Sequence, residues 1–416
     1  MAIHFDNILL RQAVSLDEIG IEKECLRVTR EGRLVQTKHP FPETDSHIDR
    51  DFCENQIEFI SGIYTDTDEL IAHLNELHDK AYQKLRENDE LLWSFSNPPF
   101  VSGEDEIPIA KFGEENKSRE LYRNYLADKY GKMKMVFSGI HYNFSFSEEF
   151  IMQSGADKDK LYLDLAQKLV KYGWLIVYLT AASPLLDKSY IQHTALSETD
   201  NYRYSSVRCS QAGYWNDFIP VLSYKSLGEY IDSIKSYIDT GLLKSSAELY
   251  YPIRLKPKGK NSLEALGNGV NHIELRMLDL NPFSRVGILK EDIDFIHLFI
   301  LWLSSLESSD FTEREQINAV KNIKKAALYD DSSVFLNIDG KQLPTAEAAR
   351  MIMQKVCEFG YRYFPKFSEA LDFQFSKLNN GSRRYANAVR NNFGRDYLLA
   401  GLKLAEIYEK GVEKIV

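Results

Sequence analysis

Residues 20–28 read GIEKECLRV and residues 50–60 read RDFCENQIEFI, and both stretches have the alternation of apolar and polar residues that is typical of a β-strand. Side chains two or four residues apart point to the same side of a strand. Each stretch therefore presents carboxylates on one side: Glu22 and Glu24 in the first, Glu54 and Glu58 in the second. A buried strand normally carries β-branched or aromatic residues at such positions, so this acidic face needs an explanation.

Two further stretches, 137–147 and 271–279, have the same alternation. Their apolar residues share one face and their polar residues share the other: His141, Asn143 and Ser145 in the first stretch, His272, Glu274 and Arg276 in the second. A solvated sheet face alternates in the same way, and for a single strand it is the more frequent explanation. Here, however, the strands would bring together the glutamates with only His141 and Arg276 to offset their charge.

Carboxylates this close together repel one another by several kcal/mol unless cations neutralise them. Hard divalent cations such as Mg²⁺ bind carboxylate oxygens, accept an occasional histidine and bridge phosphates. The acidic face therefore predicts a metal and polyphosphate site, with a solvated face as the alternative. Arginine forks bind carboxylates and phosphates through paired hydrogen bonds, and basic candidates for this role stand elsewhere in the chain: Arg123, Arg208, Arg254, Lys256 and Lys258.

The composition excludes several classes of protein. The chain of 416 residues is 44% hydrophobic and 27% charged, which is ordinary for a soluble globular protein, and its net charge of −10 argues against nonspecific nucleic-acid binding. It contains no P-loop, no GxGxxG after a strand, no GxSxG elbow, no HExxH and no kinase signature set. A P-loop NTPase and a Rossmann enzyme are therefore disfavoured.

The cysteines and the hydropathy pattern predict a cytoplasmic protein without a membrane partner. The four cysteines show no CxxC spacing, which fits a reducing compartment and argues against a disulfide framework or a zinc site. The first residues lack the features of a signal peptide. No apolar run approaches the roughly 18 residues of a membrane span.

Helical periodicity appears between and after the predicted strands. The spacing of apolar residues predicts helices over 66–90, 158–180, 290–306 and 344–362, and the chain after residue 384 is expected to be helical throughout. Because the strands are spaced too irregularly for βαβ units, we expect an α+β fold with a largely antiparallel sheet. No linker or repeat marks a domain boundary. We therefore expect a single elaborated domain over 1–416, with core motifs in 20–290 and a helical C-terminal part in 291–416.

The order of the motifs resembles that of the bacterial glutamate–cysteine ligases, relatives of glutamine synthetase. The matching segments are GIEKECLRVTREGRLVQTKHP, DFCENQIEFISG, LYRNYLADKYG, SGIHYNFSF, SSVRCSQAGY, YYPIRLKPKG and HIELRMLDLNPFSRVGI. The most specific are SGIHYNFS and the Asn281–Ser284 turn of IELRMLDLNPFS. The resemblance implies a glutamine-synthetase-like fold, in which a curved, largely antiparallel sheet forms a funnel over the active site.

The resemblance also implies roles for individual residues. Its metal ligands match Glu22, Glu24, Asp51, Glu58, His141 and Glu274. Its catalytic positions match Arg276, Arg123 and Glu274, and its ATP-binding positions match Arg123 and Arg276, with Arg254 and Lys256 as further candidates. Its substrate-binding positions match Arg208 and Tyr214, with Tyr122, Tyr251 and Met135 as further pocket candidates. The cofactor implied is Mg²⁺, as two or three ions for which Mn²⁺ can substitute, and ATP is a co-substrate.

The reaction implied is the first step of glutathione biosynthesis. ATP phosphorylates the γ-carboxylate of L-glutamate, and the α-amine of L-cysteine attacks the γ-glutamyl phosphate. Bifunctional relatives append an ATP-grasp domain that adds glycine, so a chain with only a helical tail is expected to stop at the dipeptide. Met135 stands where relatives carry Gln, and a γ-glutamyl ligase for another amine acceptor is one alternative. A non-catalytic sensor is another, disfavoured because each matched ligand position keeps a suitable residue. The sequence makes no prediction about the oligomeric state.

Overall fold

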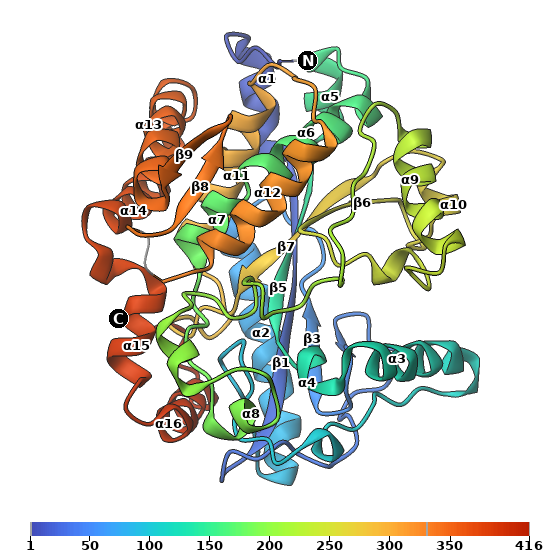
Figure 1. The fold of residues 1–416 in the computed structure, drawn as a ribbon, viewed down its shortest axis with the longest axis vertical. Helices are drawn as coiled ribbons and strands as arrows, with labels where there is room; N and C mark the ends of the chain where they lie inside the picture. Colours follow the sequence, from blue (N-terminus) through green and yellow to red (C-terminus); the bar gives the residue numbers. More distant parts are fainter. Residues whose placement is uncertain (1, 330–331, 416) are drawn as a thin grey trace.

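An open antiparallel sheet runs through the centre of the protein (Figure 1). In the computed structural model the described residues are 2–329 and 332–415. The strand order is β2–β3–β1–β5–β7–β6, β4 pairs with the end of β1, and neighbouring strands are antiparallel. The strand bounds are β1 Glu18–Thr29, β2 Ile48–Arg50, β3 Gln56–Ile60, β4 Glu90–Leu92, β5 Gly139–Ser145, β6 Ile253–Lys256 and β7 His272–Asp279. The predicted α+β class with an antiparallel sheet is confirmed.

The helices cover the sheet and build the C-terminal part of the chain. In Figure 1, α3 and α4 lie on one side of β1, and α13 to α16 lie on the other. The helix bounds are α1 Ile8–Ala13, α2 Thr67–Leu85, α3 Lys117–Tyr130, α4 Lys132–Met135, α5 Glu148–Ser154, α6 Lys158–Tyr172, α7 Trp174–Thr180, α8 Lys188–Gln192, α9 Leu227–Asp239, α10 Leu263–Leu266, α11 Lys290–Ser304, α12 Glu313–Ala326, α13 Thr345–Tyr363, α14 Ser368–Asn379, α15 Tyr385–Phe393 and α16 Tyr397–Glu409. None of the helices in the described ranges has the length and apolar character needed to span a bilayer.

The helix expected over 158–180 is interrupted at Gly173, where the chain lies close to the sheet. A Cβ at position 173 would lie 2.5 Å from the carbonyl oxygen of Leu169 and 3.0 Å from the sulfur of Met277 in β7. Only glycine leaves room for this approach. The chain therefore ends α6 at Tyr172 and starts α7 at Trp174.

The apolar face of the sheet packs on α11, which is buried on nearly all sides. Leu298, Phe299 and Leu301 of this helix have no exposed surface, as is true of Phe144 in β5 and Ile273 in β7. A helix that is apolar all round is expected in the middle of a core. Because the sheet and the C-terminal part share this core, we propose that residues 1–416 form one domain, as the sequence predicts.

The C-terminal part differs from the prediction in one element. Residues 291–416 were expected to be helical, but Phe335–Ile338 (β8) and Lys341–Pro344 (β9) form a two-stranded antiparallel hairpin. Its turn uses Asp339 and Gly340, both with positive φ. Two residues with positive φ are typical of a tight hairpin turn. The strands have only four residues each, which is too short for a clear alternation signal.

Candidate active site

The acidic face is assembled by the register of neighbouring strands. Glu22 on β1 lies opposite His141 on β5, and Glu24 on β1 lies opposite Glu58 on β3. On the other side of β5, Asn143 lies opposite Glu274 of β7. Directly opposed side chains on one sheet face are close neighbours. The alternation predicted from the sequence therefore brings carboxylates from three strands together.

These carboxylates form one wall of a cavity of about 220 Å³. The helices α3 and α4 and the segments around residues 208–214 and 247–256 supply the other walls. Of the residues that the sequence marks as site residues, those that line this cavity are Glu22, Glu24, Asp51, Glu58, Tyr122, Arg123, Met135, His141, Arg208, Tyr214, Arg254, Lys256, Glu274 and Arg276. One cavity thus contains the candidates for metal, phosphate and amino-acid binding.

Tyr251 lies outside this cavity. It packs in the main hydrophobic core and borders a small adjoining cavity of about 30 Å³, next to Cys209 and Trp215. Its neighbour Tyr250 lines the main cavity and packs against Tyr214, with ring centroids 4.1 Å apart. The sequence could not separate two adjacent tyrosines, because the segment that carries them precedes β6 and has no readable alternation. A substrate role for Tyr251 stays a prediction.

The acidic wall is the side of the cavity formed by Glu22, Glu24, Glu58 and Glu274, and His141 lies at its centre. Its Nδ1 is 2.9 Å from Oε2 of Glu22 and 3.8 Å from Oε1 of Glu274, and its Nε2 is 3.6 Å from Oε1 of Glu24. The ring is buried and Nε2 has no hydrogen-bond partner. A buried polar atom without a hydrogen-bond partner costs free energy. Nε2 would gain a partner if a metal ion were bound here. Ligand atoms of Glu22, Glu58 and His141 lie within 4.8 Å of one another, which is close enough for a single metal ion.

The two ends of the acidic wall differ in electrostatics. At the β3 end, burial together with the charges of Asp51, Glu22 and Glu24 raises the pKa of Glu58 well above its ordinary value. Burial and Asp51 also raise the pKa of Glu24. This end therefore carries more negative charge than the protein compensates. A bound cation would relieve that excess.

At the β7 end, protein cations already compensate the charge. Burial acts to raise the pKa of Glu274, but Arg276, Lys256 and His141 hold it well below its ordinary value. Nη1 of Arg276 is 3.2 Å from Oε2 of Glu274, and Nζ of Lys256 is 3.1 Å from Oε1. The carboxylate thus orients two cations that face the cavity. Both cations remain able to attract an anionic ligand.

Two other arginines are fixed by backbone carbonyls. Nη1 of Arg208 donates to the carbonyl oxygens of Arg276 at 3.0 Å and Leu278 at 3.2 Å. Nε of Arg254 donates to the carbonyl oxygen of Leu249 at 2.9 Å. Backbone anchors keep a guanidinium in place without neutralising it. These groups therefore add positive charge beside the acidic wall: Arg254 lies opposite Glu274 in the β6–β7 pair, and Arg208 is anchored on β7.

An apolar surface completes the cavity, and most of its residues carry no signal in the sequence. Met135 belongs to it as expected, and Phe52, Leu126 and Phe137 join it. No polar pattern marks these three residues, which in the sequence read as ordinary core positions. Their place in the site depends on tertiary packing.

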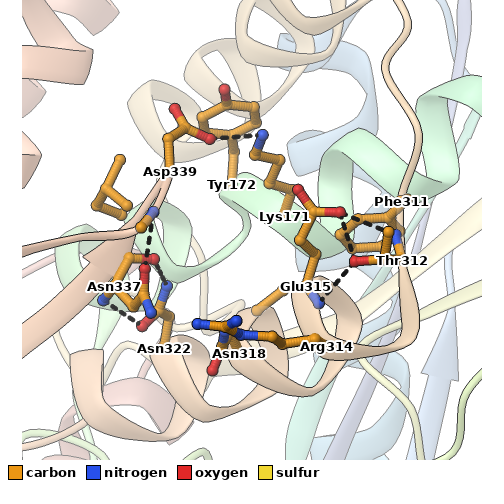
Figure 2. Close-up of a pocket in the computed structure, with 13 residues that line it drawn as sticks. Lys171, Tyr172, Phe311, Thr312, Arg314, Glu315, Asn318, Asn322, Asn337 and Asp339 are labelled. Atoms are coloured by element: carbon orange, nitrogen blue, oxygen red, sulfur yellow. Dashed lines mark hydrogen bonds and ion pairs between the residues drawn. The ribbon is translucent and has the colours of Figure 1, made fainter.

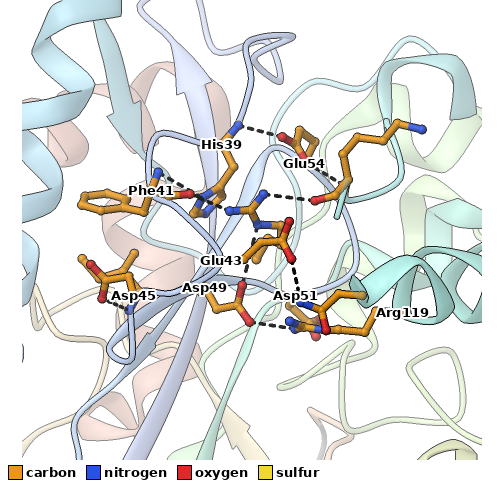
Figure 3. A network of polar contacts seen from close by, with 12 residues as sticks. His39, Phe41, Glu43, Asp45, Asp49, Asp51, Glu54 and Arg119 are labelled. Carbon is orange, nitrogen blue, oxygen red and sulfur yellow. Dashed lines mark hydrogen bonds and ion pairs between the residues drawn. The ribbon is translucent and has the colours of Figure 1, made fainter. Parts of the chain in front are cut away.

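Glu54 does not belong to the acidic wall, so the expectation that it shares a face with Glu58 is wrong. The strand β3 begins only at Gln56, and the turn before it sends Glu54 elsewhere. Figure 3 shows its carboxylate beside the backbone of His39, whose N–H lies 2.8 Å from Oε1. Oε2 accepts a hydrogen bond from the N–H of Lys111, also at 2.8 Å. Glu54 therefore ties two loops together.

A larger cavity elsewhere lacks this chemistry. It measures about 510 Å³ and lies between α6, α12 and the β8–β9 hairpin (Figure 2). Lys171 contacts Asp339 across one edge, with Nζ and Oδ1 2.8 Å apart. None of the site residues predicted from the sequence lines it. The chemistry of the side chains, and not cavity size, identifies the candidate site.

Fold and cavity together define the class: an α+β protein whose antiparallel sheet itself supplies the acidic wall of a charged ligand cavity. Residues 7–326 match the sequence profile of the glutamate–cysteine ligases. The chain belongs to the glutamate–cysteine ligase family, and the resemblance seen in its motifs is confirmed.

Relatives of two lengths match the chain. The glutathione biosynthesis bifunctional protein GshAB of Clostridium perfringens is 35% identical over 390 residues, which cover 87% of this chain and 50% of the relative. The glutamate–cysteine ligase of Clostridium acetobutylicum is 30% identical over 463 residues, which cover 94% of this chain and 96% of the relative. The chain thus spans about half the length of the bifunctional relatives.

Solved structures share the fold. The glutamate–cysteine ligase of Francisella tularensis superposes with a TM-score of 0.86 at 23% identity, over 95% of this chain and 88% of that chain. A bifunctional glutathione synthetase from Pasteurella multocida superposes with a TM-score of 0.84 at 26% identity, over 97% of this chain and 53% of that chain. The likeness extends over nearly the whole chain.

Proposed function

We propose that this protein is an ATP-dependent ligase that joins the γ-carboxylate of L-glutamate to the α-amine of L-cysteine, the first step of glutathione biosynthesis. Family membership supports the reaction class. One observation carries the proposal: a single cavity holds both an acidic wall around His141 and the cations Arg276 and Arg208. A transfer of phosphate between two anionic substrates needs both signs of charge in one place.

The proposed metal ligands are Glu22, Glu24, Asp51, Glu58, His141 and Glu274. The unpartnered Nε2 of His141 and the uncompensated charge around Glu58 support this assignment. When bound, Mg²⁺ (with Mn²⁺ as a substitute) would neutralise charge on the β- and γ-phosphates of ATP. The carboxylates of the protein would fix its place, since all of them except Asp51 lie on strands of one sheet.

The proposed phosphate-binding residues are Arg276, Lys256 and Arg123. Glu274 holds the first two in position through ion pairs. Each would stabilise negative charge on the phosphoryl group as it passes to the γ-carboxylate, with Arg254 as a further source of positive charge. The resulting γ-glutamyl phosphate is a better electrophile than a carboxylate. We therefore assign Arg276, Arg123 and Glu274 to catalysis.

A second, more apolar cavity adjoins the first and suits the nucleoside of ATP. It measures about 200 Å³ and shares Glu22 with the active-site cavity. Ile60 and Ile63 supply apolar surface, and Asn271 supplies a polar group. Nucleotide bases bind where apolar walls meet a few hydrogen-bonding groups. ATP would then extend along the sheet, with its phosphates toward His141.

We place the two amino-acid substrates at the end of the active-site cavity that lies away from the nucleoside. Arg208 is fixed by backbone carbonyls beside Tyr214 and provides a partner for a substrate carboxylate. The apolar surface of Met135 and Phe137 suits the small thiol-bearing side chain of cysteine. All proposed partners are small molecules, and we propose a cytoplasmic location.

The test is phosphate release from ATP in the presence of Mg²⁺ and L-glutamate, with a panel of amine acceptors that includes L-cysteine and L-2-aminobutyrate. The expected result is rapid release with cysteine, slower release with aminobutyrate and little release without an acceptor. A protein that releases phosphate with no member of the panel would contradict the proposal. The variant Glu58→Gln serves as the inactive control.

A further inference from the structure

One aromatic ring, Phe112, lies against three guanidinium groups at the edge of the active-site cavity. The Cζ atoms of Arg119, Arg123 and Arg50 lie 4.2, 4.7 and 5.7 Å from its centroid. Phe112 itself is only 8% exposed. Cations are attracted to the face of an aromatic ring, more strongly when water is excluded. Of the three arginines, Arg123 is the one that lines the cavity.

The backbone on both sides of Phe112 is pinned. The N–H of Lys111 donates to Oε2 of Glu54 at 2.8 Å, and its carbonyl oxygen accepts from Nη1 of Arg50 at 3.1 Å. The N–H of Gly113 donates to Oε1 of Glu43 at 2.5 Å. The two carboxylates that accept these bonds, Glu43 and Glu54, are labelled in Figure 3. The ring therefore has a fixed position relative to the sheet.

The hydrogen bonds of Arg123 all lie at the rim of its guanidinium. Nε donates to the carbonyl oxygen of Asp51, Nη1 donates to that of Arg119 at 3.1 Å, and Nη2 donates to that of Arg50 at 3.5 Å. Arg119 is itself engaged by Asp49, with Nη2 and Oδ2 2.7 Å apart. Hydrogen bonds at the rim resist a tilt of the planar group only weakly, because a carbonyl oxygen accepts over a broad range of directions. The face of Phe112 supplies the contact that fixes the tilt.

We infer that Phe112 is a positioning residue for Arg123. Glu54 and Arg50 hold the segment, the ring fixes the plane of the guanidinium, and Arg123 faces the carboxylates of the cavity in one orientation. Small errors in the placement of a charge-stabilising group cost large factors in rate. The inference rests on the proposed function only for the role of Arg123, which is to stabilise charge on the transferred phosphoryl group.

The test combines Phe112→Leu with Arg123→Lys in a double-mutant cycle. Phe112→Leu alone is expected to lower kcat about tenfold, because a desolvated cation–aromatic contact is lost. The KM for glutamate should change less than about twofold, and Phe112→Tyr, which keeps the ring, should restore kcat. In the Arg123→Lys background, Phe112→Leu should change kcat less than about twofold, because the ring acts through Arg123.

A control for the loss of a cation–aromatic contact away from the cavity is available in the same chain. Arg33 stacks on Phe100 with the same separation of 4.7 Å, and neither residue lines the active-site cavity. Arg33 is 56% exposed, so Phe100→Leu removes a contact of the same length that is open to water, and it is expected to leave kcat unchanged. Melting curves of all variants in the absence of ligands report any loss of folded protein.

Two results would overturn the inference: an unchanged kcat in folded Phe112→Leu, or the same loss of kcat in both backgrounds. The same cycle is measured for the affinity of Mg·ATP by calorimetry. If the wild-type protein releases no phosphate, the proposed function has failed, and the calorimetric cycle still decides the positioning role. Equal weakening of Mg·ATP binding by Phe112→Leu in both backgrounds would then contradict it.

Discussion

Glu24 and Glu58 lie directly opposite each other across the antiparallel pair β1–β3. Like charges at such a position destabilise a sheet. Burial and neighbouring carboxylates raise the pKa of both groups. This arrangement lowers the stability of the ligand-free protein. We expect a cation bound between these carboxylates to offset the repulsion.

Glu58→Gln removes one of the opposed charges and leaves the shape of the side chain unchanged. In EDTA we expect the variant to be more stable than the wild type by about 1 kcal/mol, because repulsion is relieved. Mg²⁺ should raise the Tm of the wild type and leave that of the variant nearly unchanged. Thermal melts with EDTA and with Mg²⁺ measure both effects, and an equal Mg²⁺ shift in both proteins would argue against Glu58 as a ligand.

Gly139→Ala should displace Arg208. A Cβ at position 139 would lie 2.2 Å from Cζ of Arg208, closer than any real contact. We expect the KM for an amino-acid substrate to rise about tenfold or more, since the guanidinium loses its anchors on the sheet. Gly228→Ala is the control, because a Cβ at that position meets nothing within 4 Å. Steady-state kinetics with glutamate and cysteine varied in turn would measure the rise in KM. Unchanged KM values for both substrates would rule out a role for Arg208 in binding.

Met135→Ala tests the apolar end of the cavity. Met135 is 4% exposed and lines the cavity beside Phe137. Loss of its side chain should weaken acceptor binding by about 1 kcal/mol, which is about a fivefold rise in the KM for cysteine. The KM for ATP should stay the same. Met152→Ala, at a position that is 64% exposed, is the control. A change in the KM for ATP alone would place Met135 at the wrong end of the site.

Lys377→Met should change how stability depends on pH. Burial lowers the pKa of Lys377 from 10.5 to about 8, although Asp292 acts to raise it. Between pH 8 and 10 the unfolded chain binds more protons at this residue than the folded chain does, so its contribution to stability rises with pH. The rise from this group is about 2 kcal/mol. Urea unfolding at pH 8, 9 and 10 should show a correspondingly flatter profile for the variant, and parallel profiles would contradict the shift.

The sequence predicted most of the acidic wall because four of its members sit in strands long enough to show alternation. Glu22, Glu24, His141 and Glu274 lie in strands of seven residues or more, where two-residue spacing is a reliable guide to facing. The prediction for Glu54 was wrong because this residue lies outside a strand. It precedes the first residue of β3, and a turn does not preserve the facing of a strand.

What the sequence missed depends on tertiary packing. The strands β2 and β6 have only three and four residues. They are too short to show an alternation of apolar and polar residues. Phe52 and Phe137 read as core residues and become cavity walls only when α3 and α4 fold over the sheet. Phe112 has no signal in the sequence at all, because its partners Arg119 and Arg123 belong to the helix that follows. Such residues are found from contacts and not from patterns.

The central claim is that the γ-carboxylate of glutamate is phosphorylated in this cavity before the amine attacks. The most direct measurement uses L-glutamate labelled with ¹⁸O in its γ-carboxylate, together with ATP, Mg²⁺ and L-cysteine, and mass analysis of the released phosphate. The account predicts that each released phosphate carries one ¹⁸O atom from glutamate. Unlabelled phosphate released together with dipeptide would show that no γ-glutamyl phosphate forms and would contradict the account.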